Sequence, residues 1–340
     1  MPDAESRPAV PAGALTDTHG RTVRDLRISV TDRCNLRCVY CMPAEGMPWL
    51  PKAQLLTYEE IARFTRVALS LGVTGVRLTG GEPTVRHDLP VLVRLLHALR
   101  PGLDLSLTTN GLKLPAMAGE LRDAGLTRVN VSLDTLDRER FRAIARRDQL
   151  AQVLAGLAAA KRAGLSPIKI NAVLMRGFNE DEAVPLARWA RDEGFELRFI
   201  EWMPLDHQKS WSRDRLVPAD EILERVHAAF PLEPAAGEDP SAPATLYRYR
   251  DGGGRVGVIA SVTRPFCGHC DRIRLTADGQ VRTCLFAHVE YDVRDLMRGG
   301  ASDADVAVLL RAAVLRKEPG HLINSPRFVQ PARGMSAIGG

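Results

Sequence analysis

Six cysteines are the residues of this chain best able to do chemistry, and they form two triplets separated by most of the sequence. The spacings are C-x3-C-x2-C in the first triplet and C-x2-C-x13-C in the second. The triplets consist of Cys34, Cys38 and Cys41, and of Cys267, Cys270 and Cys284. In a large chain without a secretory leader, clustered cysteines more often bind metal than form disulfides. We therefore expect two metal centres, the alternative being six buried or free thiols.

The composition is that of a globular protein. The 340 residues are 45% hydrophobic and 26% charged, enough to bury a sizeable core in about two domains. No apolar run approaches the roughly 18 residues of a membrane span, and residues 1–20 lack the apolar segment of a signal peptide, so we expect a cytoplasmic location. The net charge of +5 is spread along the chain, which by itself does not indicate a nucleic-acid partner.

The elements that must position the cysteines follow a βα pattern between residues 25 and 205. A short β-like run is followed by an amphipathic stretch, with a period of about 30 residues. Thr57 and Glu60 form a capping-box pattern, and Gly72 follows where that helix should end. Further helices are expected at 115–124, 148–164 and 180–194. The six predicted strands are 26–31, 75–80, 105–110, 129–134, 168–174 and 197–202.

These strands alternate between apolar and polar residues, whereas parallel strands covered on both faces are nearly continuous apolar runs. The pattern indicates helices outside and a polar inner face. The predicted fold is therefore α/β, a partial (β/α)6 TIM-like barrel around a polar ligand, with its chemistry at the carboxyl ends of the strands. The alternative is an antiparallel sheet with one wet face.

A smaller C-terminal α+β domain, carrying the second triplet, is expected after the barrel. Its predicted features are a hairpin turning at Gly252–Gly254, a second hairpin turning at Asp278–Gly279, and a helix over 303–317. The expected organisation is a flexible tail at 1–20, a barrel at 21–230, the cluster domain at 231–325, and a tail at 326–340 ending in Gly-Gly.

The first triplet directly follows the first predicted strand. Three thiolates suit three corners of a [4Fe–4S] cluster and leave one iron open, and no histidine lies in the loop to complete a zinc site. The segment RCNLRCVYC, with Tyr40 before the last cysteine, resembles the signature of radical S-adenosylmethionine (SAM) enzymes. In that family the open iron binds SAM, which is cleaved to methionine and a hydrogen-abstracting 5′-deoxyadenosyl radical.

The resemblance continues at other strand ends. Residues 79–83, TGGEP, are similar to the family's GGEP element, in which glycines let the backbone approach the ligand closely. Ser132 and Met203 match positions that contact the nucleoside. The SAM-binding residues implied by the resemblance are Tyr40, Gly81, Glu82, Ser132 and Met203.

The second triplet narrows the resemblance. CGHCDRIRLTADGQVRTCLF is similar to the C-terminal cluster segment of the GTP 3′,8-cyclases, the molybdenum cofactor biosynthesis protein A group. This implies a second [4Fe–4S] cluster whose open iron binds guanine; the alternative is a zinc site completed by His269 or His288. A triphosphate needs fixed cations, preferably arginines. The implied GTP contacts are Arg27, Arg77, Thr108, Lys169, Arg272 and Arg274.

The chain ends in MSAIGG, which also resembles the family, and its glycines could thread a narrow channel; the alternative is a frayed end. One departure is Asp271, where the family more often has Asn, so that an anion lies near the second cluster. The catalytic residues implied by the resemblance are Arg272, Arg274, Gly339 and Gly340.

The implied reaction converts GTP to (8S)-3′,8-cyclo-7,8-dihydroguanosine 5′-triphosphate by removing H3′ and joining C3′ to C8, the first step of molybdenum cofactor biosynthesis. The expected partners are GTP, an electron donor, cyclic pyranopterin monophosphate synthase downstream, and a second copy in a homodimer. Two other hypotheses stay open, a radical SAM peptide-modifying enzyme with an auxiliary cluster and a basic zinc-binding nucleic-acid module.

Overall fold

The computed structural model describes residues 13–237 and 239–339. Its six central strands are parallel neighbours in chain order and confirm the α/β partial barrel. This pairing excludes the antiparallel alternative. The strands are β1 (Asp25–Ser29), β2 (Gly75–Thr79), β3 (Asp104–Thr109), β4 (Arg128–Ser132), β5 (Ile168–Leu174) and β6 (Glu196–Glu201).

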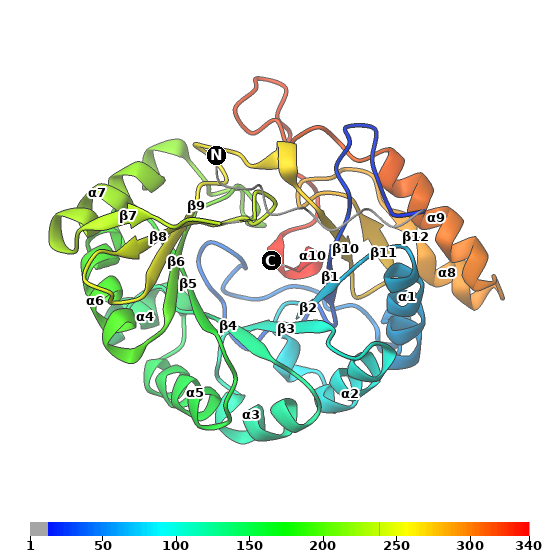
Figure 1. Ribbon diagram of the computed structural model, residues 1–340, viewed down its shortest axis with the longest axis horizontal. Helices are drawn as coiled ribbons and strands as arrows, with labels where there is room; N and C mark the ends of the chain where they lie inside the picture. Colours follow the sequence, from blue (N-terminus) through cyan, green and yellow to red (C-terminus); the bar gives the residue numbers. More distant parts are fainter. Residues whose placement is uncertain (1–12, 238, 340) are drawn as a thin grey trace.

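Helices surround the curved sheet on its outer side (Figure 1). They are α1 (Tyr58–Ser70), α2 (Leu89–Leu99), α3 (Leu114–Asp123), α4 (Arg138–Ala145), α5 (Leu150–Arg162), α6 (Ala183–Glu193) and α7 (Ala219–Ala229). The Thr57–Glu60 capping box begins α1 as predicted, because each residue's side chain accepts from the other's backbone N–H. Helices α2, α4 and α7 were not predicted from the sequence.

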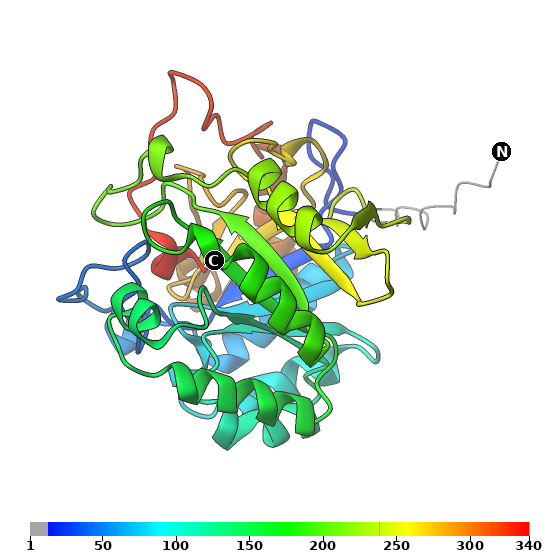
Figure 2. The same cartoon turned by 90° about the vertical axis from the view of Figure 1, so that its left-hand side faces the viewer.

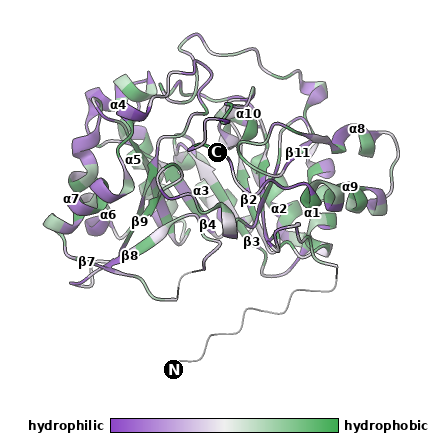
Figure 3. Cartoon of the chain, turned by 90° about the horizontal axis from the view of Figure 1, so that it is seen from above, coloured by the Kyte–Doolittle hydropathy of each residue, from purple (hydrophilic) through white to green (hydrophobic). Residues whose placement is uncertain are grey.

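Outward-facing strand side chains form the core beneath these helices. Ile28, Leu78, Leu107, Val129 and Ile170 are all fully buried. Green hydrophobic residues lie on the strands and purple hydrophilic ones on outer turns of helices such as α7 (Figure 3). The alternating polar residues are thereby directed toward the interior of the barrel.

The C-terminal part of the chain extends both edges of the same sheet. Strand β9 (Arg255–Ile259) pairs parallel with β6 and antiparallel with β8 (Thr245–Tyr249), which pairs with β7 (Leu232–Pro234). At the other edge β10 (Arg272–Leu275) pairs parallel with β1 and antiparallel with β11 (Gln280–Arg282), followed by β12 (Tyr291–Asp292). Both predicted hairpins are confirmed. The predicted limits between the domains stay a prediction.

Helices α8 (Val293–Arg298) and α9 (Asp303–Leu315) cover β11, and the predicted helix over 303–317 corresponds to α9. The segment expected to be a C-terminal tail contains a short helix, α10 (Met335–Ile338), which lies in the middle of the ring of strands (Figure 1). Short 3-10 helices occupy Lys52–Gln54, Pro83–Val85, Glu180–Glu182, Arg213–Arg215 and Cys267–His269. No helix in the described ranges is both long and apolar enough to cross a bilayer.

Candidate active site

Both cysteine triplets line one cavity inside the barrel. The cavity has a volume of about 310 Å³ and lies where the loops after the parallel strands meet the hairpin of β10 and β11. The triplets are far apart in the sequence, but β10 lies beside β1, and this pairing places the second triplet opposite the loop that follows β1. Two centres within one cavity can act on one bound molecule.

The first triplet occupies a compact loop after β1. The backbone N–H groups of Cys41 and Met42 donate to the carbonyl of Cys38, at 2.9 and 3.0 Å. Burial raises the pKa of Cys34 to about 11 and that of Cys41 to about 12. Buried thiols of this kind become thiolates when a cation joins them, and iron supplies such a charge.

The second triplet lies between the 3-10 turn Cys267–His269 and the end of β11. Burial alone would raise the pKa of Cys270, but the nearby charges of Arg272 and Lys317 outweigh it and hold that pKa below its usual value. All six cysteines are free of disulfides. Neither His269 nor His288, the two predicted zinc ligands, lines the cavity, whereas His321 does.

The three thiols of each triplet are the ligands that iron–sulfur clusters use, and both triplets line the same cavity. Within residues 13–237 and 239–339, no three His, Cys, Asp or Glu side chains surround a common point that could hold a metal ion. Each triplet supplies three thiols from one short loop or hairpin to the same cavity. Three cysteines leave one iron of a [4Fe–4S] cluster open for a small molecule.

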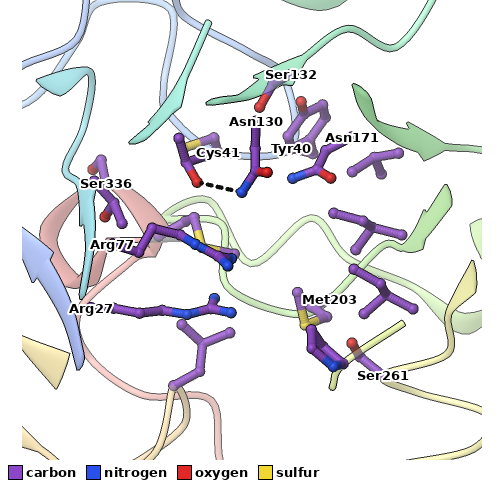
Figure 4. A pocket seen from close by; sticks show the side chains of 18 of the residues that line it. Arg27, Tyr40, Cys41, Arg77, Asn130, Ser132, Asn171, Met203, Ser261 and Ser336 are labelled. Atoms are coloured by element: carbon purple, nitrogen blue, oxygen red, sulfur yellow. Dashed lines mark hydrogen bonds between the residues drawn. The ribbon is translucent and has the colours of Figure 1, made fainter. Parts of the chain in front are cut away.

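Arginines on the inner strand face give the cavity a positive lining. Arg27 and Arg77 are register partners on β1 and β2, and their side chains run nearly parallel into the cavity (Figure 4). Burial, followed by the charge of Arg27, lowers the pKa of Arg77 to about 9. Arg272 and Arg274 extend this row from β10, since Arg274 pairs with Arg27 in the register. Such close cations repel one another, and a polyanion relieves the repulsion.

Several buried polar atoms at these positions lack a hydrogen-bond partner among the described residues. Those that belong to residues lining the cavity and are not covered by Gly339 are Nε of Arg27, Nε of Arg272 and Oδ1 of Asn130. Unpaired buried polar groups are costly, and a bound polar ligand satisfies them. The cavity therefore fits a polar, anionic small molecule.

Two predicted substrate contacts differ in their placement. Thr108 lines the cavity and faces Asn130, whose Nδ2 lies 3.3 Å from Thr108 Oγ1. Lys169 shares the inward side of β5 but lies outside the lining, with its Nζ 3.4 Å from Glu196 Oε1. Asp271 is also outside the lining, and its carboxylate lies 3.6 Å from Arg272 Nε.

All five predicted SAM-binding residues line the cavity, but Glu82 has a structural task as well. Its buried carboxylate accepts from the N–H of Thr84 and Asn110, and from the hydroxyls of Thr84 and Thr109, at 2.5–3.0 Å. Gly81 packs so closely on the carbonyls of Asp32 and Arg33 that a side chain there would collide with backbone. The Glu82 carboxylate therefore fixes the glycine loop to the end of β3.

Tyr40 is held by residues at the carboxyl ends of β4 and β5. Its hydroxyl donates to Asp134 Oδ2 at 2.7 Å, while Asp134 Oδ1 accepts from the N–H of Val173 at 2.9 Å. Burial raises the pKa of Asp134 to about 6. Ser132 and Met203 lie on opposite sides of the cavity, as Figure 4 shows.

The C-terminal segment enters the same cavity. Met335 and Ser336 line it, and a guanidinium N–H of Arg274 donates to the carbonyl of Gly339. Gly339 has a φ of 73° and fits between the hydroxyls of Ser29 and Thr79, where a side chain would collide with both. The predicted role of Gly340 lies outside the described residues.

The sequence analysis missed Arg198, Asn130 and Asn171 as site residues. All three line the cavity, and Arg198 pairs with Glu196 at 2.6 Å. All three occupy polar positions of the alternating pattern along the strands. Arg198 on β6 is the register partner of Asn171 on β5. The rule that alternate residues of each strand point into the barrel would have been enough to identify them.

Comparison with known families and structures defines the class of protein. The Radical SAM superfamily model matches residues 28–190, which contain the first triplet. A Streptococcus suis SuiB structure bound to S-adenosylmethionine superposes with a TM-score of 0.63 at 15% identity, covering 93% of this chain and 77% of that one. The fold is shared, and residues 28–190 match the radical SAM superfamily, whose members use SAM and a [4Fe–4S] cluster.

The second half of the chain narrows the class. Residues 195–323, with the second triplet, match the Molybdenum Cofactor Synthesis C family model. The GTP 3′,8-cyclase of Mycolicibacterium smegmatis is 53% identical over 342 residues, covering 99% of this chain and 95% of the relative. That of Streptomyces coelicolor is 54% identical over 331 residues, covering 97% of each. This chain is a member of the GTP 3′,8-cyclase family.

Proposed function

We propose that this chain converts GTP to (8S)-3′,8-cyclo-7,8-dihydroguanosine 5′-triphosphate, the first step of molybdenum cofactor biosynthesis. One observation carries the proposal: two cysteine triplets and a row of inward arginines line a single cavity. Family membership supplies the reaction, since curated relatives at about 53% identity are named GTP 3′,8-cyclase. The reaction removes H3′ of GTP and joins C3′ to C8 of its guanine.

The first triplet would hold a [4Fe–4S] cluster, and the residues around it would bind SAM. When bound, these groups supply the one-electron chemistry that removes a hydrogen atom from the substrate. The chain's own contribution is placement. Glu82 fixes the glycine loop, while Asp134 orients the ring of Tyr40 through its hydroxyl.

Cations on the inner face would bind the triphosphate. Arg27 and Arg77 present forked donors on adjacent strands, and Arg198 faces them from β6. Lys169 adds a charge deeper in the barrel, beside Glu196. Fixed donors of this kind orient a polyanion without reorganising during the reaction.

The second triplet would hold a second [4Fe–4S] cluster with an open iron for guanine. Arg272 and Arg274 lie on one face of β10, between this triplet and the inner arginines of the barrel. Arg274 also binds Gly339, so the C-terminal segment lies against the proposed substrate site. Met335 and Ser336 cover the cavity there and help to exclude water.

The proposal extends to the setting of the reaction. The product would pass to cyclic pyranopterin monophosphate synthase, and a separate reductase would supply electrons. Six reduced cysteines suit iron–sulfur binding in the cytoplasm. A homodimer is the proposed assembly.

The test is anaerobic incubation of the iron–sulfur-loaded protein with SAM, reductant and GTP carrying deuterium at C3′. We expect an isomer of GTP on chromatography and deuterium in the 5′-deoxyadenosine released. Arg272→Ala and Arg274→Ala should abolish the isomer while uncoupled SAM cleavage continues. No transfer of deuterium, or zinc in place of iron in the purified protein, would overturn the proposal.

A further inference from the structure

Two buried cations outside the cavity bind the backbone around the second triplet. Arg21 precedes β1 and is 7% exposed; Lys317 follows α9 and is 3% exposed. Neither side chain lines the cavity, so neither contacts a substrate there. Buried Lys and Arg side chains are uncommon unless they are paired, and each therefore requires an explanation.

Arg21 connects three segments of the chain. Its Nε lies 2.5 Å from Asp17 Oδ2, which neutralises its charge. Its Nη1 donates to the carbonyls of Cys267 and Pro319, at 2.8 and 3.2 Å, and its Nη2 donates to the carbonyl of Glu318 at 2.7 Å. The backbone of Cys267 is thereby tied to the segment after α9 and to the turn that precedes β1.

Lys317 holds the other two cysteine-bearing segments together. Its Nζ donates to the carbonyl of Arg272, two residues after Cys270, at 2.8 Å. It also donates to the carbonyl of Thr283, the residue before Cys284. Thr283 is fixed further, since its hydroxyl donates to Glu318 Oε2 at 2.8 Å.

Arg21 has an ion-pair partner in Asp17, and Lys317 differs from it in this respect. Across the described ranges, no carboxylate oxygen lies within 4.0 Å of its Nζ. A buried cation without a carboxylate is costly, and a nearby anion offsets that cost. The nearby groups that can be anionic are Glu318, whose carboxylate accepts from the Thr283 hydroxyl, and the thiols of the triplet, of which Cys284 directly follows the carbonyl that Lys317 binds.

We propose that Arg21 and Lys317 are positioning residues for the second iron–sulfur cluster. Arg21 holds the segment of Cys267, and Lys317 holds those of Cys270 and Cys284 while placing a positive charge beside their thiolates. This inference rests on the second cluster of the proposed function. Outer contacts of this kind orient metal ligands and tune the metal.

The experiment uses the full chain with Cys34, Cys38 and Cys41 changed to Ala, so that only the second cluster can form. Iron, sulfide and the midpoint potential from an EPR-monitored titration are measured. Lys317→Gln keeps a donor but loses the charge, and Lys317→Arg keeps the charge. Arg21→Gln loses the forked contacts. Arg316→Gln is the matched control, because Arg316 is exposed beside Lys317.

We expect about four iron and four sulfide per chain in the parent and in Arg316→Gln. Lys317→Gln should lower the midpoint potential, because reduction adds a negative charge that the ammonium no longer stabilises, and Lys317→Arg should restore it. Arg21→Gln should lose iron to a chelator about tenfold faster. Circular dichroism checks that each variant is folded.

The outcomes separate the two proposals. A parent that binds no iron refutes the second cluster and with it part of the proposed function. A parent that binds a full cluster, with unchanged potential in Lys317→Gln and unchanged iron release in Arg21→Gln, overturns only the inference. If Lys317→Gln does not fold, Lys317→Met takes its place as the uncharged variant, and a midpoint potential equal to that of Arg316→Gln contradicts the role of Lys317.

Discussion

Single residues in the barrel divide between binding and support. Arg27, Arg77 and Arg198 present cationic side chains to the cavity. The carboxylates of Glu82 and Asp134 instead accept hydrogen bonds from the backbone of neighbouring segments. The distinction follows from their hydrogen bonds: the buried Glu82 carboxylate already accepts four, whereas Nε of Arg27 has no hydrogen-bond partner among the described residues.

The charge of Lys169 should make the affinity for GTP depend on pH. Burial, followed by the charge of Arg198, lowers its pKa to about 8, despite the opposing effect of Glu196. A lysine aids triphosphate binding only when protonated, so its contribution is nearly complete at pH 7 and is lost as the pH rises through about 8. We expect GTP affinity, measured by calorimetry on the cluster-free protein, to fall about three- to tenfold between pH 7 and pH 9.

The control is Lys169→Arg, which stays charged across this window. Its affinity for GTP should fall less between the two pH values than that of the wild-type protein, and the fall that remains belongs to Arg77, whose pKa is lowered to about 9. Equal affinity of the wild-type protein at pH 7 and pH 9 would show that Lys169 does not contribute charge to the triphosphate.

At the scale of elements, the C-terminal segment is tied to two separate loops at the end of the barrel where the parallel strands terminate. Arg333 binds both carboxylate oxygens of Asp278 in the turn between β10 and β11, at 3.0 and 2.8 Å. The second loop follows β6, where Gln330 donates to the carbonyl of Asp206 and Met335 donates to that of Leu205. Figure 2 shows α10, in red, at the end of the barrel that also carries the blue loop after β1. These contacts offset the loss of chain entropy when α10 enters the cavity.

Arg333→Gln should therefore release α10. Loss of the two-pronged, partly exposed ion pair is expected to speed amide exchange in residues 335–339 about five- to tenfold, as followed by mass spectrometry. Arg327→Gln, an exposed change in the same segment, should leave that exchange as in the wild type. Identical exchange in both variants would assign the placement of α10 to its other contacts.

On the scale of the whole molecule, the two regions that match family models, residues 28–190 and 195–323, share one sheet and one core. Val256 of β9, Ile273 of β10 and Leu310 of α9 belong to the same buried cluster as Ile28 and Leu78. The strands on both sides of the barrel therefore depend on partners from the last third of the chain.

A chain that stops after residue 230 tests this dependence. It would expose the edges of β1 and β6 and the apolar surface that β9 and β10 cover, so we expect aggregation and dye binding instead of cooperative unfolding. Size-exclusion chromatography and thermal unfolding measure the outcome. A monomeric, cooperatively folding fragment would instead support an independent barrel domain at 21–230.

The sequence by itself determined the chemistry and the barrel. Cysteine spacing is local, so the triplets indicate their ligand geometry without a fold, and alternation along each strand indicates which side chains point inward. Only the tertiary structure decided which cations reach the cavity and what joins the triplets. Arg198 rather than Lys169 lines it, and β10 beside β1 brings Arg274 to Arg27. Such contacts link residues more than 200 positions apart, and they depend on how the sheet closes, which no short stretch of sequence encodes.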